Sequence, residues 1–233
     1  MQQEFNRQLL LDIRPEQRPT LDNFVAGANA ELLARLRALS QPRTFDAVYL
    51  WGPPGSGRTH LLRATHAAAD AAHRRSVYVA GAEAGAELPC PPGGLLVVDD
   101  VDRLDGTAQI ALFRAFNTAR LAGLALLMSG AAPPLQLTLR EDLRTRIGSA
   151  LVYEVKPLTD EDRAAALKIH AAQRGMRVED ELIGFLLRHA PRDLPTLMAV
   201  LDALDLASLE RKRPVTLPLL REVLQSLAAT QDT

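Results

Sequence analysis

Residues 52–59 read GPPGSGRT, and this stretch decides the fold. An apolar run, AVYLW (47–51), precedes it, and a segment of helical composition, RTHLLRATHAAADAA (58–72), follows it. The spacing G-x-x-x-x-G-[K]-[ST] between a strand and a helix is that of a phosphate-binding loop. Its glycines let backbone N–H groups turn toward phosphate oxygens, and the helix N-terminus adds a partial positive charge. The residues expected to surround a bound nucleotide are Gly52, Pro53, Pro54, Gly55, Ser56, Gly57, Arg58, Thr59 and His60.

The loop departs from the pattern at one position, where Arg58 stands in place of Lys. Arginine carries a bulkier, fork-shaped head with a permanent charge, so its contact with the β- and γ-phosphates differs from that of lysine. We therefore expect nucleotide to bind and its hydrolysis to be impaired. The alternative is that the glycines and prolines only make a turn between strand and helix.

A second candidate element is LLVVDD (95–100), an apolar run that ends in two carboxylates. Ligands gather at the carboxyl ends of strands in open α/β sheets. Asp99 is suited to hold Mg²⁺ through water, together with Thr59, and Asp100 to orient an attacking water. Two acids after a strand also occur as a turn or helix cap, which is the alternative here.

The order of apolar runs predicts the architecture. Five short runs, 47–51, 76–80, 95–99, 124–129 and 150–155, alternate with helical segments, which indicates a parallel α/β sheet. After residue 156 the pattern is helical only, and Thr159 is a plausible first N-cap. We expect a leader over 1–20, an α/β nucleotide-binding domain over 21–156 and a small all-α domain over 157–233.

Composition narrows the class of protein. The chain has 233 residues, 47% of them hydrophobic and 24% charged, with a net charge of −1. Such a balance does not predict tight non-specific binding to nucleic acid. The single cysteine, Cys90, excludes an internal disulfide, and the N-terminus lacks the basic and apolar regions of a secretion signal. No apolar run has the roughly 20 residues of a membrane helix. We expect a cytoplasmic protein with no membrane partner.

Several motifs in order resemble the AAA+ family, in the group of the bacterial replication initiator DnaA. They are LDNFVAGANAELL (21–33), the phosphate loop, LLVVDD, Phe116-Asn117, MSGAAPP (128–134), LRTRI (143–147) and PRDL (191–194). The resemblance implies a five-stranded parallel sheet with a helical lid. It also implies ATP or ADP as the ligand, with or without Mg²⁺ as a cofactor.

The resemblance also assigns roles to single residues. Arg146 stands where the family has an arginine finger that reaches a neighbouring subunit's nucleotide. A homo-oligomer is therefore one of the assemblies that the resemblance allows. Arg192 stands at the sensor 2 arginine, which contacts phosphate from the lid, and Ser129 stands at sensor 1 without the expected acidic neighbour. For both arginines the alternative is a solvated surface side chain. Phe24, Val25 and Asn29 match the family's adenine-side segment, although a hydrophobic staple would also explain Phe24.

Within this group the chain resembles the Hda-like paralogues of DnaA, regulatory inactivators of the initiator. The end of the phosphate loop, GRTH (57–60), has arginine at position 58 and histidine at position 60 and is similar to the loop of these paralogues. The initiator carries a C-terminal helix-turn-helix domain, whereas this chain ends at Thr233 after the lid helices. We therefore expect no direct sequence-specific DNA binding.

The leader contains a motif that resembles the clamp-binding motif of replication proteins, Gln-Leu-x-Leu-x-apolar. An extended peptide near a chain terminus can place alternate apolar side chains in one pocket while an amide hydrogen-bonds at its rim. The matching residues are Gln8, Leu9, Leu11 and Ile13. Packing of this segment on its own domain is the alternative.

Together these features predict an adenine-nucleotide-binding regulator, with ADP as the expected ligand. It docks on the DNA polymerase sliding clamp and supplies Arg146 to the ATP site of initiator DnaA. Its own ATPase activity is expected to be weak or absent. One alternative is an AAA+ ATPase that uses its own ATP, as a helicase loader or initiator-like assembly factor. Another is an interaction module whose nucleotide is structural.

Overall fold

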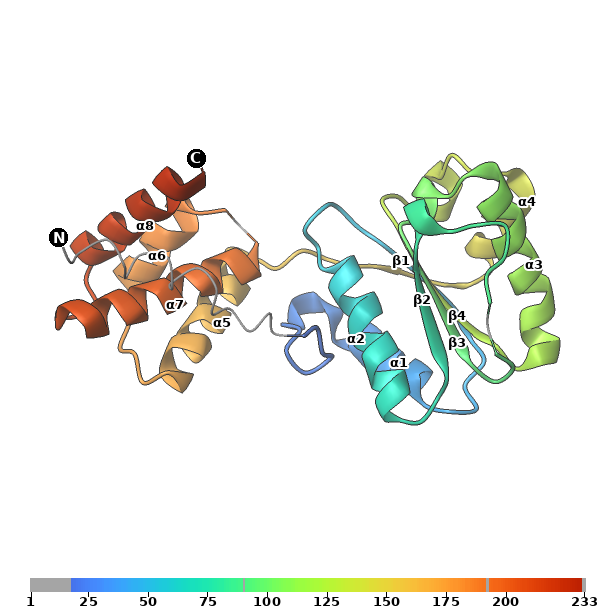
Figure 1. The fold of residues 1–233 in the computed structure, drawn as a ribbon, viewed down its shortest axis with the longest axis horizontal. Coiled ribbons are helices and arrows are strands. Elements are labelled where there is room, and N and C mark those ends of the chain that lie inside the picture. Colours follow the sequence, from blue (N-terminus) through green and yellow to red (C-terminus); the bar gives the residue numbers. More distant parts are fainter. Residues whose placement is uncertain (1–17, 90, 192, 232–233) are drawn as a thin grey trace, which may run out of the picture. The chain divides into compact units, whose positions relative to one another are not determined.

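The computed structural model describes residues 18–89, 91–191 and 193–231. The chain divides into two compact units, with the division between Lys156 and Pro157. The first unit holds the sheet and the second is helical, and each is described by itself below (Figure 1).

The sheet of the first unit has five parallel strands in the order β2-β3-β4-β1-β5. Their bounds are β1 (Ala47–Trp51), β2 (Ser76–Ala80), β3 (Leu95–Asp99), β4 (Ala125–Gly130) and β5 (Leu151–Glu154). The predicted five-stranded parallel sheet is therefore confirmed. Because the strands are parallel, the segments that follow β1, β3 and β4 emerge at the same edge of the sheet.

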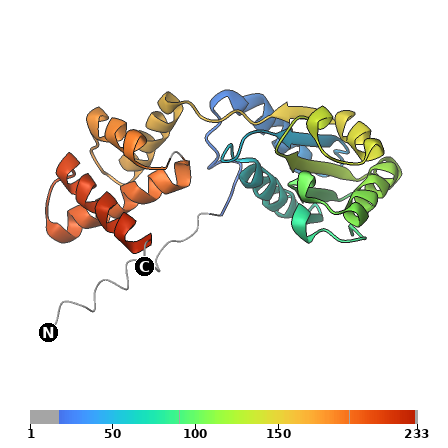
Figure 2. The same ribbon diagram turned by 90° about the horizontal axis from the view of Figure 1, so that it is seen from above.

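Helices cover both faces of this sheet. On one face lie α1 (Ala30–Ser40) and α2 (Arg58–Ala71), and on the other lie α3 (Gly106–Ala122) and α4 (Glu141–Gly148) (Figures 1 and 2). Successive strand residues point to opposite faces: Val48 and Leu50 belong to the core under α1 and α2, while Tyr49 belongs to the core under α3 and α4. The strands are thus buried on both sides, which explains their nearly continuous apolar sequence.

Short 3₁₀ helices occupy several connections of this unit. They are η1 (Gly27–Asn29), η2 (Gly81–Glu83), η3 (Val101–Arg103) and η4 (Pro134–Gln136). Two of them lie at the carboxyl edge of the sheet: η2 follows β2 directly, and η3 follows β3 after Asp100.

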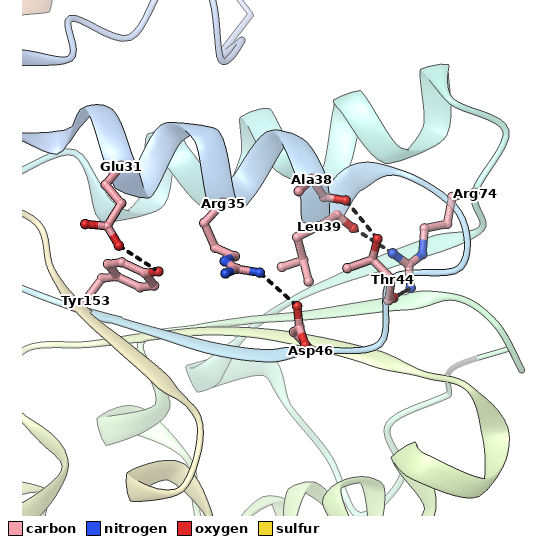
Figure 3. A network of polar contacts seen from close by, with 8 residues as sticks. All are labelled: Glu31, Arg35, Ala38, Leu39, Thr44, Asp46, Arg74 and Tyr153. Atoms are coloured by element: carbon pink, nitrogen blue, oxygen red, sulfur yellow. Dashed lines mark hydrogen bonds and ion pairs between the residues drawn. The ribbon is translucent and has the colours of Figure 1, made fainter.

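A buried arginine holds the opposite end of the sheet. Arg74 is 3% exposed, and its guanidinium donates to the carbonyls of Leu39 at 2.6 Å, Gln41 at 2.9 Å, Thr44 at 2.7 Å and Gly94 at 2.8 Å. Figure 3 shows this side chain reaching the loop between α1 and β1. A buried cation is tolerated only when its donors are satisfied, so these carbonyls fix the loop that leads into β1.

Two further side-chain pairs join α1 to the sheet. Arg35 on α1 donates to Asp46 at 3.1 Å, and the hydroxyl of Tyr153 on β5 donates to Glu31 at 3.4 Å (Figure 3). Both pairs are partly exposed and add only modestly to stability. They orient α1, which follows directly on the segment expected near the adenine.

The second unit consists of α5 (Asp160–Gln173), α6 (Asp180–His189), α7 (Leu194–Arg211) and α8 (Leu217–Gln231). Thr159 caps α5 in a capping box with Asp162, as its sequence predicts. Leucines such as Leu167, Leu186 and Leu201 form its own apolar core. Among the described residues, no helix of either unit is both long and apolar enough to cross a membrane.

Candidate functional site

The loop between β1 and α2 has the backbone that its glycines allow. Gly55 and Gly57 adopt φ angles of 77° and 96°, a region that side chains disfavour, and Gly57 is the N-cap of α2. A Cβ on Gly52 would lie 2.7 Å from the Val155 carbonyl oxygen, so this position also requires glycine. The stretch therefore turns sharply and delivers its backbone to the N-terminus of α2, where anions are stabilised.

Two polar atoms at this loop are buried without a hydrogen-bond partner among the described residues. They are the hydroxyl of Ser56, a residue 7% exposed, and Nη1 of Arg58. Leaving a buried donor without a partner lowers the stability of a folded protein by about 1–3 kcal/mol, so such atoms are uncommon in native structures. Together with the helix N-terminus they provide donors for an anionic group such as a phosphate.

The other guanidinium nitrogen of Arg58 faces Asp100. Nη2 of Arg58 lies 3.6 Å from Asp100 Oδ1, and the two side chains are 13% and 32% exposed. Asp100 has a φ of 52°, and its backbone N–H donates to the hydroxyl of Ser129 at 2.9 Å. Burial raises the pKa of the Asp100 carboxyl, the neighbouring charge of Asp99 raises it further, and Arg58 opposes this. The arginine is thus the main counter-charge of this carboxylate.

Asp99 precedes Asp100 at the end of β3, and each of its carboxylate oxygens accepts a hydrogen bond. It is 4% exposed, the hydroxyl of Tyr78 donates to one oxygen at 2.7 Å, and the hydroxyl of Ser129 donates to the other in a short contact. Burial is the main cause that raises the pKa of Tyr78 to about 12, so its hydroxyl stays protonated as a donor. Ser129 lies inside β4 and bridges Asp99 to the backbone of Asp100.

The two expected metal ligands, Thr59 and Asp99, have different surroundings. Thr59 is exposed, and Asp99 already accepts two hydroxyl hydrogen bonds. Within the described ranges, no group of three or more His, Cys, Asp or Glu side chains is placed to hold a metal ion. The assignment of Mg²⁺ to Thr59 and Asp99 stays a prediction, and the hydrogen bonds on Asp99 argue against it.

The expected adenine-side residues lie beside the loop in different ways. Phe24 packs on the loop: a Cβ on Gly57 would lie 2.7 Å from Phe24 Cε2, and the ring is 5.6 Å from that of His60. Asn29 is 4% exposed and uses its amide on the backbone of Lys156, with both contacts at 2.9 Å. Asn29 therefore anchors the chain segment, whereas Phe24 borders the loop.

Val25, the third adenine-side residue, and His60 of the phosphate loop are both half-buried. Nε2 of the His60 ring lies 3.1 Å from the carbonyl oxygen of Thr20. Burial lowers the pKa of His60, while the Thr20 carbonyl works in the opposite direction. The ring is thus neutral near pH 7 and suited to apolar packing against Phe24.

Arg146 lies away from this loop, in the last turn of α4, and is exposed. Its guanidinium carbon is 6.0 Å from the centre of the Phe113 ring. Arg140 beside it is held by Asp142 through two contacts, at 3.1 and 2.8 Å. A shallow depression runs over this surface, lined by Phe113, Arg140, Glu141, Asp142, Thr145 and Arg146. The arrangement leaves a permanent cation at the surface of this unit.

The remaining expected residues lie outside the described part of the chain. These are Gln8, Leu9, Leu11 and Ile13 of the leader, and Arg192.

Two features of the site were not predicted from the sequence, namely Tyr78 and the contact that Ser129 makes with Asp99. In the sequence Tyr78 is one residue of an apolar run that predicts a strand, and no residue near it in the sequence indicates a carboxylate partner. The strand order supplies the explanation, because β2 and β4 flank β3 and bring Tyr78 and Ser129 to the two sides of Asp99.

Comparisons with known proteins agree with the fold and the loop. Residues 16–87 match the family model of the bacterial DnaA ATPase domain, and residues 160–224 match that of the Hda lid domain. An uncharacterised protein of Haemophilus influenzae is 34% identical over 228 residues, which cover 94% of this chain and 99% of that protein.

Solved structures show the same fold at lower identity. Domain III of the Thermotoga maritima replication initiation protein DnaA superimposes with a TM-score of 0.70 and 19% identity, covering 90% of this chain and 97% of that one. AMPPCP-bound DnaA from Aquifex aeolicus gives a TM-score of 0.66 and 20% identity, covering 83% and 67%.

Proposed function

The chain belongs to the Hda/DnaA-like family of AAA+ proteins, and from this premise we propose that it is a nucleotide-dependent regulator of replication initiation. In the proposal it binds ADP, docks on the DNA sliding clamp through its leader, and stimulates ATP hydrolysis by initiator DnaA. The observation that carries the proposal is the pairing of a lid of the Hda type with a phosphate loop that has Arg58 in place of lysine.

The loop supports nucleotide binding with slow turnover. The Ser56 hydroxyl and Arg58 Nη1, which find no partner in the part of the chain that the structure describes, offer donors to phosphate at the N-terminus of α2. Asp100, the candidate for orienting an attacking water, has a raised pKa and Arg58 beside it. A carboxylate paired with a fixed guanidinium is less free to orient an attacking water, so ADP is the expected ligand of the working state.

The surface of α4 supports action on a partner. A finger must carry a permanent charge, be exposed, and keep its side chain in place. Arg146 meets these conditions through its position in the last turn of α4 and its contact with the Phe113 ring. In well-studied systems such a finger is worth about 10³- to 10⁵-fold in the rate of phosphoryl transfer. We propose that Arg146 reaches the ATP of DnaA in trans.

The leader motif supplies the link to DNA. Gln8, Leu9, Leu11 and Ile13 would enter a pocket of the sliding clamp and so bring the regulator to replicating DNA, where no DNA-binding surface of its own is needed.

The test measures the ATP turnover of initiator DnaA with clamp loaded on DNA, in the presence and absence of this protein. The proposal expects stimulation that needs both clamp and ADP. The opposite result would be an unchanged turnover of DnaA together with hydrolysis of the chain's own ATP at about 1 to 10³ per second. That result would refute the proposed regulator and favour the helicase-loader alternative.

A further inference from the structure

We infer that the nucleotide site of this chain holds ADP without magnesium, because its acidic residues are already occupied by partners from the chain itself. The inference rests on the proposed binding of ADP and adds a statement about the form in which ADP is bound. It follows from the contacts of Asp99, Asp100 and Arg58.

The first step concerns Asp99. A carboxylate that holds a hydrated Mg²⁺ needs free oxygen lone pairs that face the water shell of the ion. Asp99 gives one oxygen to the hydroxyl of Tyr78 at 2.7 Å and the other to the hydroxyl of Ser129, and it is 4% exposed. These hydroxyls come from the two strands that flank β3, so the sheet itself holds them in place. Each oxygen of Asp99 keeps one further lone pair, but the residue is only 4% exposed, so it offers little surface to the water shell of an ion.

The second step concerns Asp100. Its Oδ1 lies 3.6 Å from Arg58 Nη2, and this pair is mostly shielded from solvent. The fixed cation already neutralises the carboxylate that would otherwise attract a divalent ion. A cation placed between Asp99 and Asp100 would meet the guanidinium as well as the two acids.

The third step concerns the charge of the diphosphate. Magnesium normally neutralises part of this charge, so a site without it needs another source of positive charge. The planar fork of arginine can donate from two nitrogens in different directions, whereas lysine offers one point charge. Arg58 can thus keep Asp100 on Nη2 and offer to phosphate its buried Nη1, which has no hydrogen-bond partner among the described residues, beside the Ser56 hydroxyl and the N-terminus of α2.

The experiment titrates the full-length chain with ADP by calorimetry, once with MgCl₂ and once with EDTA. The inference expects dissociation constants that differ by less than about twofold between the two conditions. If ADP binds but its affinity falls by about tenfold or more in EDTA, the inference is overturned while the proposed nucleotide binding stands. If ADP binds in neither condition, the proposed nucleotide binding fails, and the inference fails with it.

A pair of variants tests the role given to the hydroxyls. Tyr78→Phe frees one oxygen of Asp99, so magnesium should now improve ADP binding by about tenfold. Tyr49→Phe is the matched control: it removes a buried tyrosine hydroxyl from the same sheet, but one that donates to the Ala132 carbonyl at 2.6 Å. It should keep the parent's insensitivity to magnesium.

Ser129→Ala frees the other oxygen of Asp99 and repeats the test independently of Tyr78. If either variant fails to fold in a thermal melt, the other variant and the titration of the parent still decide the question. Magnesium insensitivity that persists in both folded variants would show that the hydroxyls do not exclude the ion, and would overturn that role.

Discussion

Replacing Arg58 by alanine tests how the phosphate loop works without its usual lysine. The side chain joins two sites: Nη2 lies 3.6 Å from Asp100, and Nη1 is buried without a partner among the described residues. The substitution removes the cation that would face the bound phosphate. It also removes the counter-charge of Asp100. We expect a large loss of ADP affinity and a small loss of stability.

The magnitudes follow from these two contacts. At 3.6 Å the Coulomb energy of the pair is roughly 5 kcal/mol at an effective dielectric constant of about 20, but desolvation offsets most of it. The free energy of unfolding should therefore fall by no more than about 1 kcal/mol. A hydrogen bond to a charged group contributes about 1.5–3 kcal/mol, so the affinity for ADP should fall about 10- to 150-fold.

Calorimetric titration of ADP into both proteins measures this loss, and chemical denaturation measures the change in stability. Arg35→Ala is the matched control, because Arg35 pairs with Asp46 at the opposite end of β1 and carries the same charge. It should leave the affinity for ADP unchanged. An Arg58→Ala protein that binds ADP as tightly as the parent would refute the role assigned to the guanidinium.

Three other expectations can be checked on purified protein. A raised pKa means that the unfolded Asp100 ionises first, so the resulting penalty on stability is present above the raised pKa and vanishes below the ordinary value of 3.8. Asp100→Asn should therefore be at least as stable as the parent at pH 7, and the difference should narrow as the pH falls; lower stability at pH 7 would contradict this. Arg74→Met removes the guanidinium donor from four carbonyls, of which Gly94 keeps the backbone N–H of Ala125, and should lower the free energy of unfolding by at least about 3 kcal/mol in urea melts, whereas a loss within error would mean that water replaces the guanidinium. Changing Gln8, Leu9 and Leu11 together to Ala should abolish co-elution with sliding clamp and spare the melting temperature and ADP affinity; loss of stability with retained clamp binding would show instead that the leader packs on its own domain.

The parts of the fold that depend on local sequence were predictable. The glycine spacing of residues 52–59 specifies a turn, and the apolar runs specify strands buried on both faces. The cap at Thr159 was predictable for the same reason, since the hydroxyl bonds to an N–H only three residues away. In each case the physical cause lies within a few residues of the feature.

The contacts at the site depend on strand order, which the sequence does not reveal locally. Tyr78 and Ser129 are far from Asp99 in the chain, and only the order β2-β3-β4 brings their hydroxyls to its two oxygens. Similarly, Asn29 matches a segment expected near adenine, but its buried amide is committed to the backbone of Lys156. A motif predicts which residue types are present, whereas the packing decides which partners they meet.

The most direct test of the proposed function follows the ATP turnover of initiator DnaA on clamp-loaded DNA with the parent protein and with Arg146→Ala. Arg144→Ala serves as a comparison, because it removes a neighbouring charge from the same helix. We expect Arg146→Ala to keep ADP binding, clamp binding and folding but to lose most of the stimulation, on the order of 10³-fold if the finger acts as in known systems. Full stimulation by Arg146→Ala would refute the role of Arg146 as the finger, and a loss of stimulation in Arg144→Ala instead would assign the finger to Arg144.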